Sequence, residues 1–211
     1  MNEDAIIYIV DDNEGVTESL CWLIESVGYK VEVYNNARAF LEKFDPTKIS
    51  CAILDVRMPE LSGPELQEAL LKRGHEVPLI FITGHADVSV AVRAMKLGAV
   101  DFLTKPTNSQ VLLESINKAI RLDIRRRQKQ EQSADVSLRE KRLSPREREV
   151  MRLIVSGKLT KAIADTLNLS MRTVEMHRAN IMKKMEVNSQ VELTSLILRN
   201  GLISEDELLG V

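Results

Sequence analysis

The sequence contains few aromatic residues, only two cysteines and no long apolar run. Aromatic side chains make up 4% of the 211 residues. Cys21 and Cys51 both lie within apolar patterns, and neither has the Cys or His neighbours of a zinc site or redox motif. We therefore expect two reduced core thiols in a cytoplasmic protein. Because no run is long enough to cross a bilayer, we expect no membrane partner.

An excess of either charge is also lacking, because the net charge is only −2. The two halves of the chain nevertheless differ. Residues 1–120 contain 11 Lys and Arg against 18 Asp and Glu, whereas residues 121–211 contain 18 against 13. An acidic first half joined to a basic second half indicates different partners, and the basic half favours nucleic acid.

Short apolar segments alternate with amphipathic ones in the first half. The segments with strand length are 5–10, 30–34, 51–55, 77–83 and 99–103. Helical periodicity lies between and after them, in 16–27, 64–72, 87–97 and 108–122. This alternation predicts an α/β domain with a doubly wound parallel sheet of five strands, helices on both faces and right-handed crossovers.

A charged segment and then a strand-free region follow. We assign residues 123–142 to a charged, helical linker and residues 143–211 to a second domain, after a first domain of residues 1–122. Ser144, Pro145 and Glu147 have the spacing of a capping box with proline at the first helical position. Four short helices are predicted in this all-α domain, at 144–157, 160–167, 171–185 and 190–200.

Polar side chains lie at the carboxyl ends of the predicted strands, where doubly wound sheets bind ligands. Asp11 and Asp12 follow the first strand, Asp55 ends the third, Thr83 ends the fourth, and Lys105 follows the fifth. Carboxylate oxygens suit Mg²⁺, a carboxylate can become an acyl phosphate, and a lysine and a hydroxyl can bind phosphoryl oxygens. The set predicts a site for magnesium and a phosphoryl group.

The motifs IVDDN, LDVRMPELSG, FITGHAD and DFLTKP resemble the receiver domain of two-component response regulators. The resemblance implies a flavodoxin-like sheet with strand order 2-1-3-4-5 and Asp55 as the phospho-acceptor. It implies Mg²⁺ bound by Asp11, Asp12, Asp55 and the backbone carbonyl of Arg57, and a phosphoryl group held by Thr83 and Lys105. Further implications are a cis Lys105–Pro106 bond, a switch formed by Thr83 and Phe102, and a dimer face with Val92, Lys96 and Asp101. Thr107 departs from the FixJ-like pattern, in which an aromatic residue usually follows the Lys-Pro pair.

Two helices separated by a short turn, 160–167 and 171–185, have the spacing of a helix-turn-helix. Val174, Ile181 and Met185 share one face suited to a core. This region resembles the LuxR-type output domain, and the order of the two domains resembles the NarL/FixJ family. We expect phosphate or base contacts from Lys161, Arg172, Thr173, Glu175, Met176, His177, Arg178, Ala179 and Lys183.

These features predict a transcription factor, not an enzyme acting on a separate substrate, although a receiver can catalyse its own phosphorylation and dephosphorylation. A sensor histidine kinase would phosphorylate Asp55, and the resulting homodimer would bind a pseudo-palindromic operator in double-stranded DNA and activate transcription, with RNA polymerase as a further partner. Two alternatives remain open. One is a DNA-binding regulator whose receiver only docks proteins, and the other is a metal-dependent phosphatase, which the Arg at position 57 disfavours.

Overall fold

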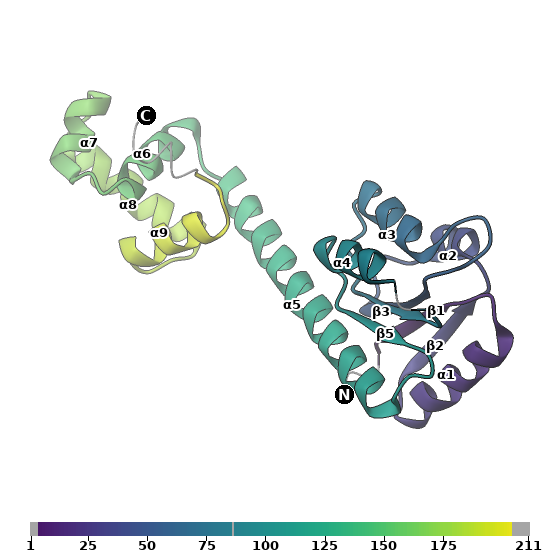
Figure 1. Ribbon diagram of the computed structural model, residues 1–211. Helices are drawn as coiled ribbons and strands as arrows, with labels where there is room; N and C mark the ends of the chain where they lie inside the picture. Colours follow the sequence, from purple (N-terminus) through teal and green to yellow (C-terminus); the bar gives the residue numbers. More distant parts are fainter. Residues whose placement is uncertain (1–3, 86, 204–211) are drawn as a thin grey trace. The chain divides into compact units, whose positions relative to one another are not determined.

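The computed structural model describes residues 4–85 and 87–203, which divide between Arg127 and Gln128 into two compact units. The first unit is an α/β domain with five parallel strands in the order β2-β1-β3-β4-β5 (Figure 1). Its strands are β1 (Ile6–Val10), β2 (Lys30–Tyr34), β3 (Ser50–Asp55), β4 (Leu79–Thr83) and β5 (Asp101–Thr104). Its helices are α1 (Glu14–Ser26), α2 (Ala37–Lys43), α3 (Gly63–Lys72), α4 (Val88–Lys96) and the first part of α5 (Ser109–Lys141). The predicted fold class and strand order are confirmed.

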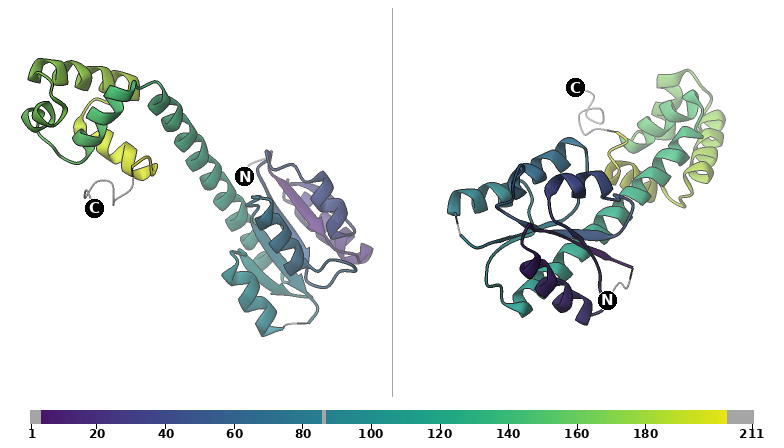
Figure 2. Two further views of the ribbon diagram at one scale, coloured as in Figure 1. Left: turned by 90° about the horizontal axis from the view of Figure 1, so that it is seen from above. Right: turned by 90° about the vertical axis from the view of Figure 1, so that its right-hand side faces the viewer.

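Successive side chains of each strand face opposite sides of the sheet, which gives the unit two apolar cores. Ile7 and Ile9 of β1 pack in one core with residues of α1 and α5. Tyr8 and Val10 pack in the other core with residues of α2, α3 and α4. Helices therefore cover both faces of the sheet, as the views in Figure 2 show. Strands buried on both faces explain the nearly continuous apolar runs in the sequence.

The strand register brings the functional ends together. Val10 of β1 lies opposite Leu54 of β3, so Asp11 and Asp55 follow at one edge of the sheet. Thr83 of β4 lies opposite Thr104 of β5, so Lys105 follows Thr83 at the same edge. Parallel pairing thus gathers residues from four strands that lie far apart in the sequence.

Helix α5 is anchored to the first unit by a buried carboxylate. Asp123 is fully buried and accepts hydrogen bonds from Ser50 N (3.1 Å), Arg127 Nε (2.7 Å) and a terminal nitrogen of Arg126. Arg127 also donates to the carbonyls of Pro46, at 2.9 Å, and Thr47, at 3.0 Å. Residues 123–127, which the sequence analysis places in the linker, thus pack within the first unit.

The second unit contains the end of α5 and the helices α6 (Pro145–Val155), α7 (Thr160–Leu167), α8 (Met171–Met185) and α9 (Gln190–Arg199). One apolar core joins them, and Val136 of α5 belongs to it. The predicted capping box is present, because Ser144 Oγ accepts from Glu147 N and Glu147 accepts from Ser144 N.

Individual elements of the first unit also differ from the sequence-based expectation. Helix α2 was not predicted, although Asn36 caps it by accepting a hydrogen bond from Ala39 N. Strand β4 begins at Leu79, two residues after the predicted start, because Pro78 has no N–H to contribute to a strand ladder. Within the described ranges, every helix is too short or too polar to span a bilayer.

Glu147 connects the start of α6 to α8, and it makes the second unit sensitive to acid. Its carboxylate accepts a hydrogen bond of 2.7 Å from Lys184 Nζ. Burial alone would raise the pKa of Glu147, but Lys184 and the bonds with Ser144 hold this pKa below its ordinary value of 4.5. A depressed pKa gives stability that is present above the unfolded-state pKa and is lost as pH falls through the folded-state pKa.

We expect Glu147→Gln to lower the free energy of unfolding of the second unit at neutral pH by about 1–2 kcal/mol, because a charge-assisted hydrogen bond is lost. The difference between wild type and variant should shrink as the pH falls through the pKa of Glu147. Hydrogen exchange of the α6 amides, followed at neutral and at acidic pH, measures both the loss of stability and its dependence on pH. A difference that is independent of pH would show that the charge of Glu147 contributes nothing.

Candidate functional site

Lys105 joins two buried carboxylates at the carboxyl edge of the sheet. Its Nζ lies 2.6 Å from Asp11 Oδ2 and 2.6 Å from Asp55 Oδ1. The other oxygens are bound by the backbone, since Asn13 N donates to Asp11 Oδ1 at 3.0 Å and Arg57 N donates to Asp55 Oδ2 at 2.6 Å. The predicted grouping of Asp11, Asp55 and Lys105 is therefore present in the structure.

The lysine is held in its charged form. Burial alone would lower the pKa of Lys105, but hydrogen bonds from its ammonium to Asp11 and Asp55, with their negative charges, raise this pKa above its ordinary value of 10.5. A permanent ammonium group beside Asp55 is suited to binding an anionic phosphoryl group. The Lys105–Pro106 peptide bond is cis, as the resemblance implied.

The donor set suits a hard divalent cation. Asp11 and Asp55 are buried, whereas Asp12, which follows Asp11 in the chain, is exposed. Three carboxylates and one ammonium leave two uncompensated negative charges, which match the charge of Mg²⁺. In the arrangement described for 4–85 and 87–203, no three His, Cys, Asp or Glu side chains group as a metal site, and the Lys105 ammonium lies between Asp11 and Asp55.

Thr83 is buried at the end of β4, but its hydroxyl interacts with the following loop. Thr83 Oγ1 donates to the carbonyl of His85 at 3.0 Å and accepts from His85 N at 3.2 Å. The backbone carbonyl of Thr83 accepts from Lys105 N at 2.7 Å, which ties the ends of β4 and β5 together. The Thr83 hydroxyl is therefore hydrogen-bonded to the loop that follows β4.

Phe102 lines a cavity beside the loops that follow β3 and β4. The cavity measures about 270 Å³ and also contacts His85, Val90 and Arg57. Phe102 packs against Phe81 with ring centroids 6.0 Å apart, and its ring is only partly buried. The space beside Phe102 is thus bordered by the same loop that binds the Thr83 hydroxyl.

Gly63 is a site residue that the sequence analysis did not identify. Its backbone N–H donates to Val56 O at 3.1 Å, and it begins α3 next to the Asp55 backbone. A Cβ at this position would lie 2.3 Å from the carbonyl oxygen of Asp55. Only glycine permits this approach. In the sequence, the one sign of it was a glycine directly after Ser62, the residue that caps α3.

The residues expected on a dimer face are not equally accessible. Val92 and Lys96 are exposed on α4, where Val88 and Met95 extend the exposed apolar surface. Asp101 is half-buried, and its carboxylate accepts from Ser115 Oγ at 2.5 Å and from Phe102 N at 2.9 Å. The α4 residues are therefore the accessible part of this predicted face.

Helix α8 presents a buried face and an exposed face. Val174, Ile181 and Met185 are fully buried, as predicted. Most residues expected to meet DNA are exposed, namely Lys161, Arg172, Glu175, Met176, Ala179 and Lys183, whereas Thr173, His177 and Arg178 are half-buried. The second helix of the pair thus has an accessible surface for nucleic acid.

Two of the polar side chains on α8 also have partners within the unit. Arg178 donates to Gln190 Oε1 at 2.8 Å, which connects α8 to α9. Glu175 Oε1 accepts from Thr160 Oγ1 at 2.7 Å, which connects α8 to the start of α7. These side chains can position α8, the second or recognition helix of the helix-turn-helix, as well as contact a partner.

Both units match known families. The model of the response regulator receiver domain matches residues 7–117, and that of the bacterial regulatory proteins of the luxR family matches residues 141–197. The transcriptional regulatory protein FixJ of Bradyrhizobium diazoefficiens is 40% identical over 97% of this chain and 100% of its own length. The response regulator protein TmoT of Ectopseudomonas mendocina is 40% identical over 94% of this chain and 90% of its own.

Solved structures support the same assignment. The structure of the response regulator StyR is 39% identical and has a TM-score of 0.83 over 93% of this chain and 99% of that one. Full-length FixJ from B. japonicum is 40% identical with a TM-score of 0.56, over 94% of this chain and 98% of that one.

Proposed function

The chain belongs to the response regulators of the NarL/FixJ type, which join a receiver domain to a LuxR-type DNA-binding domain, and we propose that phosphorylation of Asp55 controls its binding to DNA. The observation that carries this proposal is the Lys105 ammonium, which lies 2.6 Å from an oxygen of Asp55 and 2.6 Å from one of Asp11. The receiver domain implies a sensor histidine kinase as the phosphoryl donor.

In the proposed reaction, an Asp55 oxygen attacks the phosphorus of a phosphohistidine. The phosphorus–nitrogen bond breaks as the new phosphorus–oxygen bond forms, and the imidazole leaving group takes up a proton. Asp11, Asp12, Asp55 and the Arg57 carbonyl would hold Mg²⁺, which neutralises charge on the phosphoryl oxygens when bound. Lys105 and the Thr83 hydroxyl would bind those oxygens, and the bond between Thr83 and His85 would be given up.

Phosphorylation would then change the surface around α4. Thr83 moves toward the phosphoryl group, and Phe102 turns within the cavity of about 270 Å³. The exposed surface of α4 around Val92 then becomes suited to binding a second copy of the chain. A dimer places two recognition helices on half-sites about one DNA turn apart, so we expect a pseudo-palindromic operator. Moving the equilibrium from mostly off to mostly on requires on the order of 5 kcal/mol of differential stabilisation. We further propose that the bound dimer activates transcription, with RNA polymerase as a further partner.

Sedimentation and DNA binding of wild type and Asp55→Asn, each incubated with acetyl phosphate and Mg²⁺, test this mechanism. We expect wild type to change from monomer to dimer and to bind its operator more tightly, and we expect Asp55→Asn to do neither. A phosphorylated monomer that gains DNA affinity without dimerising would contradict the dimer mechanism.

Glu175 is the residue of α8 whose role in sequence recognition is most open to test. If it accepts a hydrogen bond from a base, Glu175→Ala should relax preference at one operator position by about 1–3 kcal/mol. Thr160→Val is the matched control, because it removes the bond to Glu175 Oε1 and leaves the carboxylate in place. Binding to operator variants measures both effects. Equal weakening on all sequences by both variants would assign Glu175 to positioning of the helix.

A further inference from the structure

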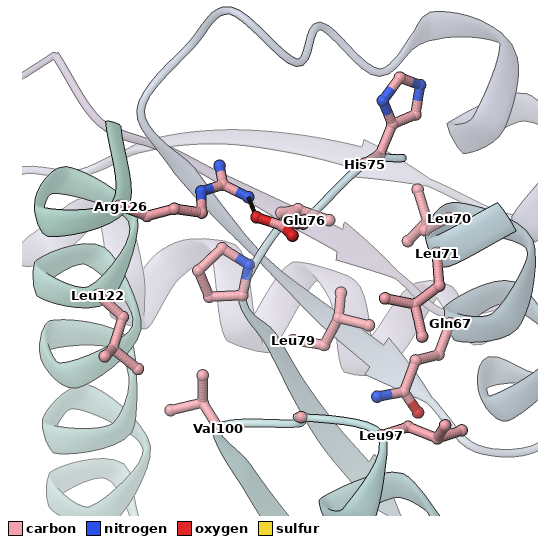
Figure 3. Close-up of a pocket in the computed structure, with 13 residues that line it drawn as sticks. Gln67, Leu70, Leu71, His75, Glu76, Leu79, Leu97, Val100, Leu122 and Arg126 are labelled. Carbon is pink, nitrogen blue, oxygen red and sulfur yellow. Dashed lines mark ion pairs between the residues drawn. The ribbon is translucent and has the colours of Figure 1, made fainter. Parts of the chain in front are cut away.

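Helix α3 contacts the Asp55 backbone at its start and the end of α4 at its second turn. It begins at Gly63, whose N–H donates to Val56 O at 3.1 Å, and a Cβ at this position would overlap the Asp55 carbonyl. Because no space remains there, a displacement of the Asp55 backbone would move the start of α3. Figure 3 shows Gln67, one turn later, extending from α3 toward Leu97, the residue that caps the end of α4, and both residues line one cavity. Helix α3 therefore connects the predicted phospho-acceptor to the helix that carries most of the predicted dimer face.

Gln67 is bonded to α4 through one half of its side-chain amide. It is only 2% exposed, and its Nε2 donates to the backbone carbonyl of Ala94 at 3.2 Å. Ala94 is fully buried, whereas Val92 and Lys96, two residues to either side of it, are exposed and belong to the predicted dimer face. The bond from Gln67 therefore holds the backbone of α4 between two residues of that face.

The hydrogen bonds around Gln67 are unequally shared. The Ala94 carbonyl accepts twice, from Gln67 Nε2 and from Ala99 N at 3.1 Å, and the second of these bonds closes the turn that follows α4. Gln67 Oε1 is buried and has no donor among the described residues. An unpaired buried acceptor is costly, whereas a carbonyl that loses one of two donors stays bonded. Because Gln67 Nε2 and Ala99 N meet the same oxygen, the Ala99 N–H lies close to the Gln67 amide.

We propose that Gln67 is a positioning residue that couples Asp55 to α4 by an exchange of one hydrogen bond. In the structure, the Ala99 N–H binds Ala94 O. In the phosphorylated chain the turn after α4 moves, and the Ala99 N–H binds Gln67 Oε1 instead, so that each acceptor has one donor. Gln67 thereby stabilises the phosphorylated arrangement and the dimer that it forms. The inference rests on the proposed function and adds a route through α3 to the one through β4 and β5.

Hydrogen-bond scalar couplings in NMR test the exchange of partners on the isotopically labelled full chain. Without phosphorylation, we expect a coupling between the Ala99 amide nitrogen and the Ala94 carbonyl carbon, and none between that nitrogen and the side-chain carbonyl carbon of Gln67. With Mg²⁺ and beryllium fluoride, a stable mimic of a phosphoryl group on a carboxylate, the first coupling should disappear and the second should appear. Asp55→Asn should keep the first coupling under both conditions.

Gln67→Met tests the consequence for assembly, because it keeps the length of the side chain and removes both polar groups. The phosphorylated variant should dimerise about 10- to 100-fold more weakly than phosphorylated wild type, since each of two chains loses one hydrogen bond and one bond provides about 3- to 10-fold. Gln110→Met is the matched control, because it makes the same change at an exposed position whose partner, Glu114, is also exposed. It should dimerise as wild type does. Sedimentation measures the dimer dissociation constants, and intact mass checks that phosphorylation is equal.

Two results would overturn this inference and leave control by phosphorylation intact. In the first, beryllium fluoride shifts the Arg57 amide, which donates to Asp55 Oδ2, while the coupling between Ala99 and Ala94 remains. In the second, phosphorylated Gln67→Met dimerises as tightly as wild type. If instead the Arg57 amide does not shift and wild type gains no phosphoryl group, the proposed function fails and this inference fails with it.

Discussion

Lys105→Met is expected to lower the free energy of unfolding of the first unit by about 2–3 kcal/mol in the absence of Mg²⁺. The substitution leaves the Asp11 and Asp55 carboxylates buried at one edge without the ammonium that lies 2.6 Å from both. Breaking a buried ion pair by removing one partner typically costs about 3–5 kcal/mol, and the partial exposure of Lys105 reduces this value. Mg²⁺ should restore much of the loss, because a divalent cation compensates the same carboxylates.

Urea unfolding followed by near-ultraviolet circular dichroism isolates this effect. All eight aromatic residues lie before position 103, so the signal reports the first unit alone. Lys30→Met is the control, because its partner Asp4 is exposed and the pair should contribute little. Equal sensitivity of wild type and Lys105→Met to Mg²⁺ would mean that the lysine and the cation do not serve the same carboxylates.

Asp123→Asn is expected to destabilise the first unit by about 3 kcal/mol. The carboxylate is fully buried and binds Arg126, Arg127 and the backbone N–H of Ser50. Asn removes its negative charge and replaces one of its two acceptor oxygens with an NH2 group, which faces the same donors. It should also release α5 from the start of β3. Faster hydrogen exchange of the β3 amides would accompany the lower stability.

Asp4→Asn is the matched control for this second variant, since it makes the same chemical change at an exposed position. No measurable loss of stability is expected there. If Asp123→Asn were as stable as Asp4→Asn, the buried cluster would contribute specificity of packing instead of stability.

The strands and their functional ends were predictable because a parallel sheet imposes simple rules. Short apolar runs mark strands buried on both faces, and parallel pairing places the carboxyl ends of these strands at one edge of the sheet. Asp11, Asp55 and Lys105 could therefore be grouped before the structure was known. Their individual roles came from the family resemblance, because spacing alone does not separate a phospho-acceptor from a metal ligand.

Other features depended on contacts that no local pattern records. The bond between Asp123 and Ser50 N joins residues 73 positions apart, so the carboxylate appeared only as one charge in a charged segment. The need for glycine at position 63 arises from the Asp55 backbone nearby. Arg178 was predicted to contact DNA, yet its bond to Gln190 depends on how α9 packs beside α8.

The central claim is that Asp55 accepts a phosphoryl group, and intact mass spectrometry tests it most directly. Wild type and Asp55→Asn are incubated in parallel with acetyl phosphate and Mg²⁺. The account predicts a gain of one phosphoryl group on wild type, removed by hydroxylamine as expected of an acyl phosphate, and no gain on Asp55→Asn. No gain on wild type, or equal gain on both proteins, would contradict it.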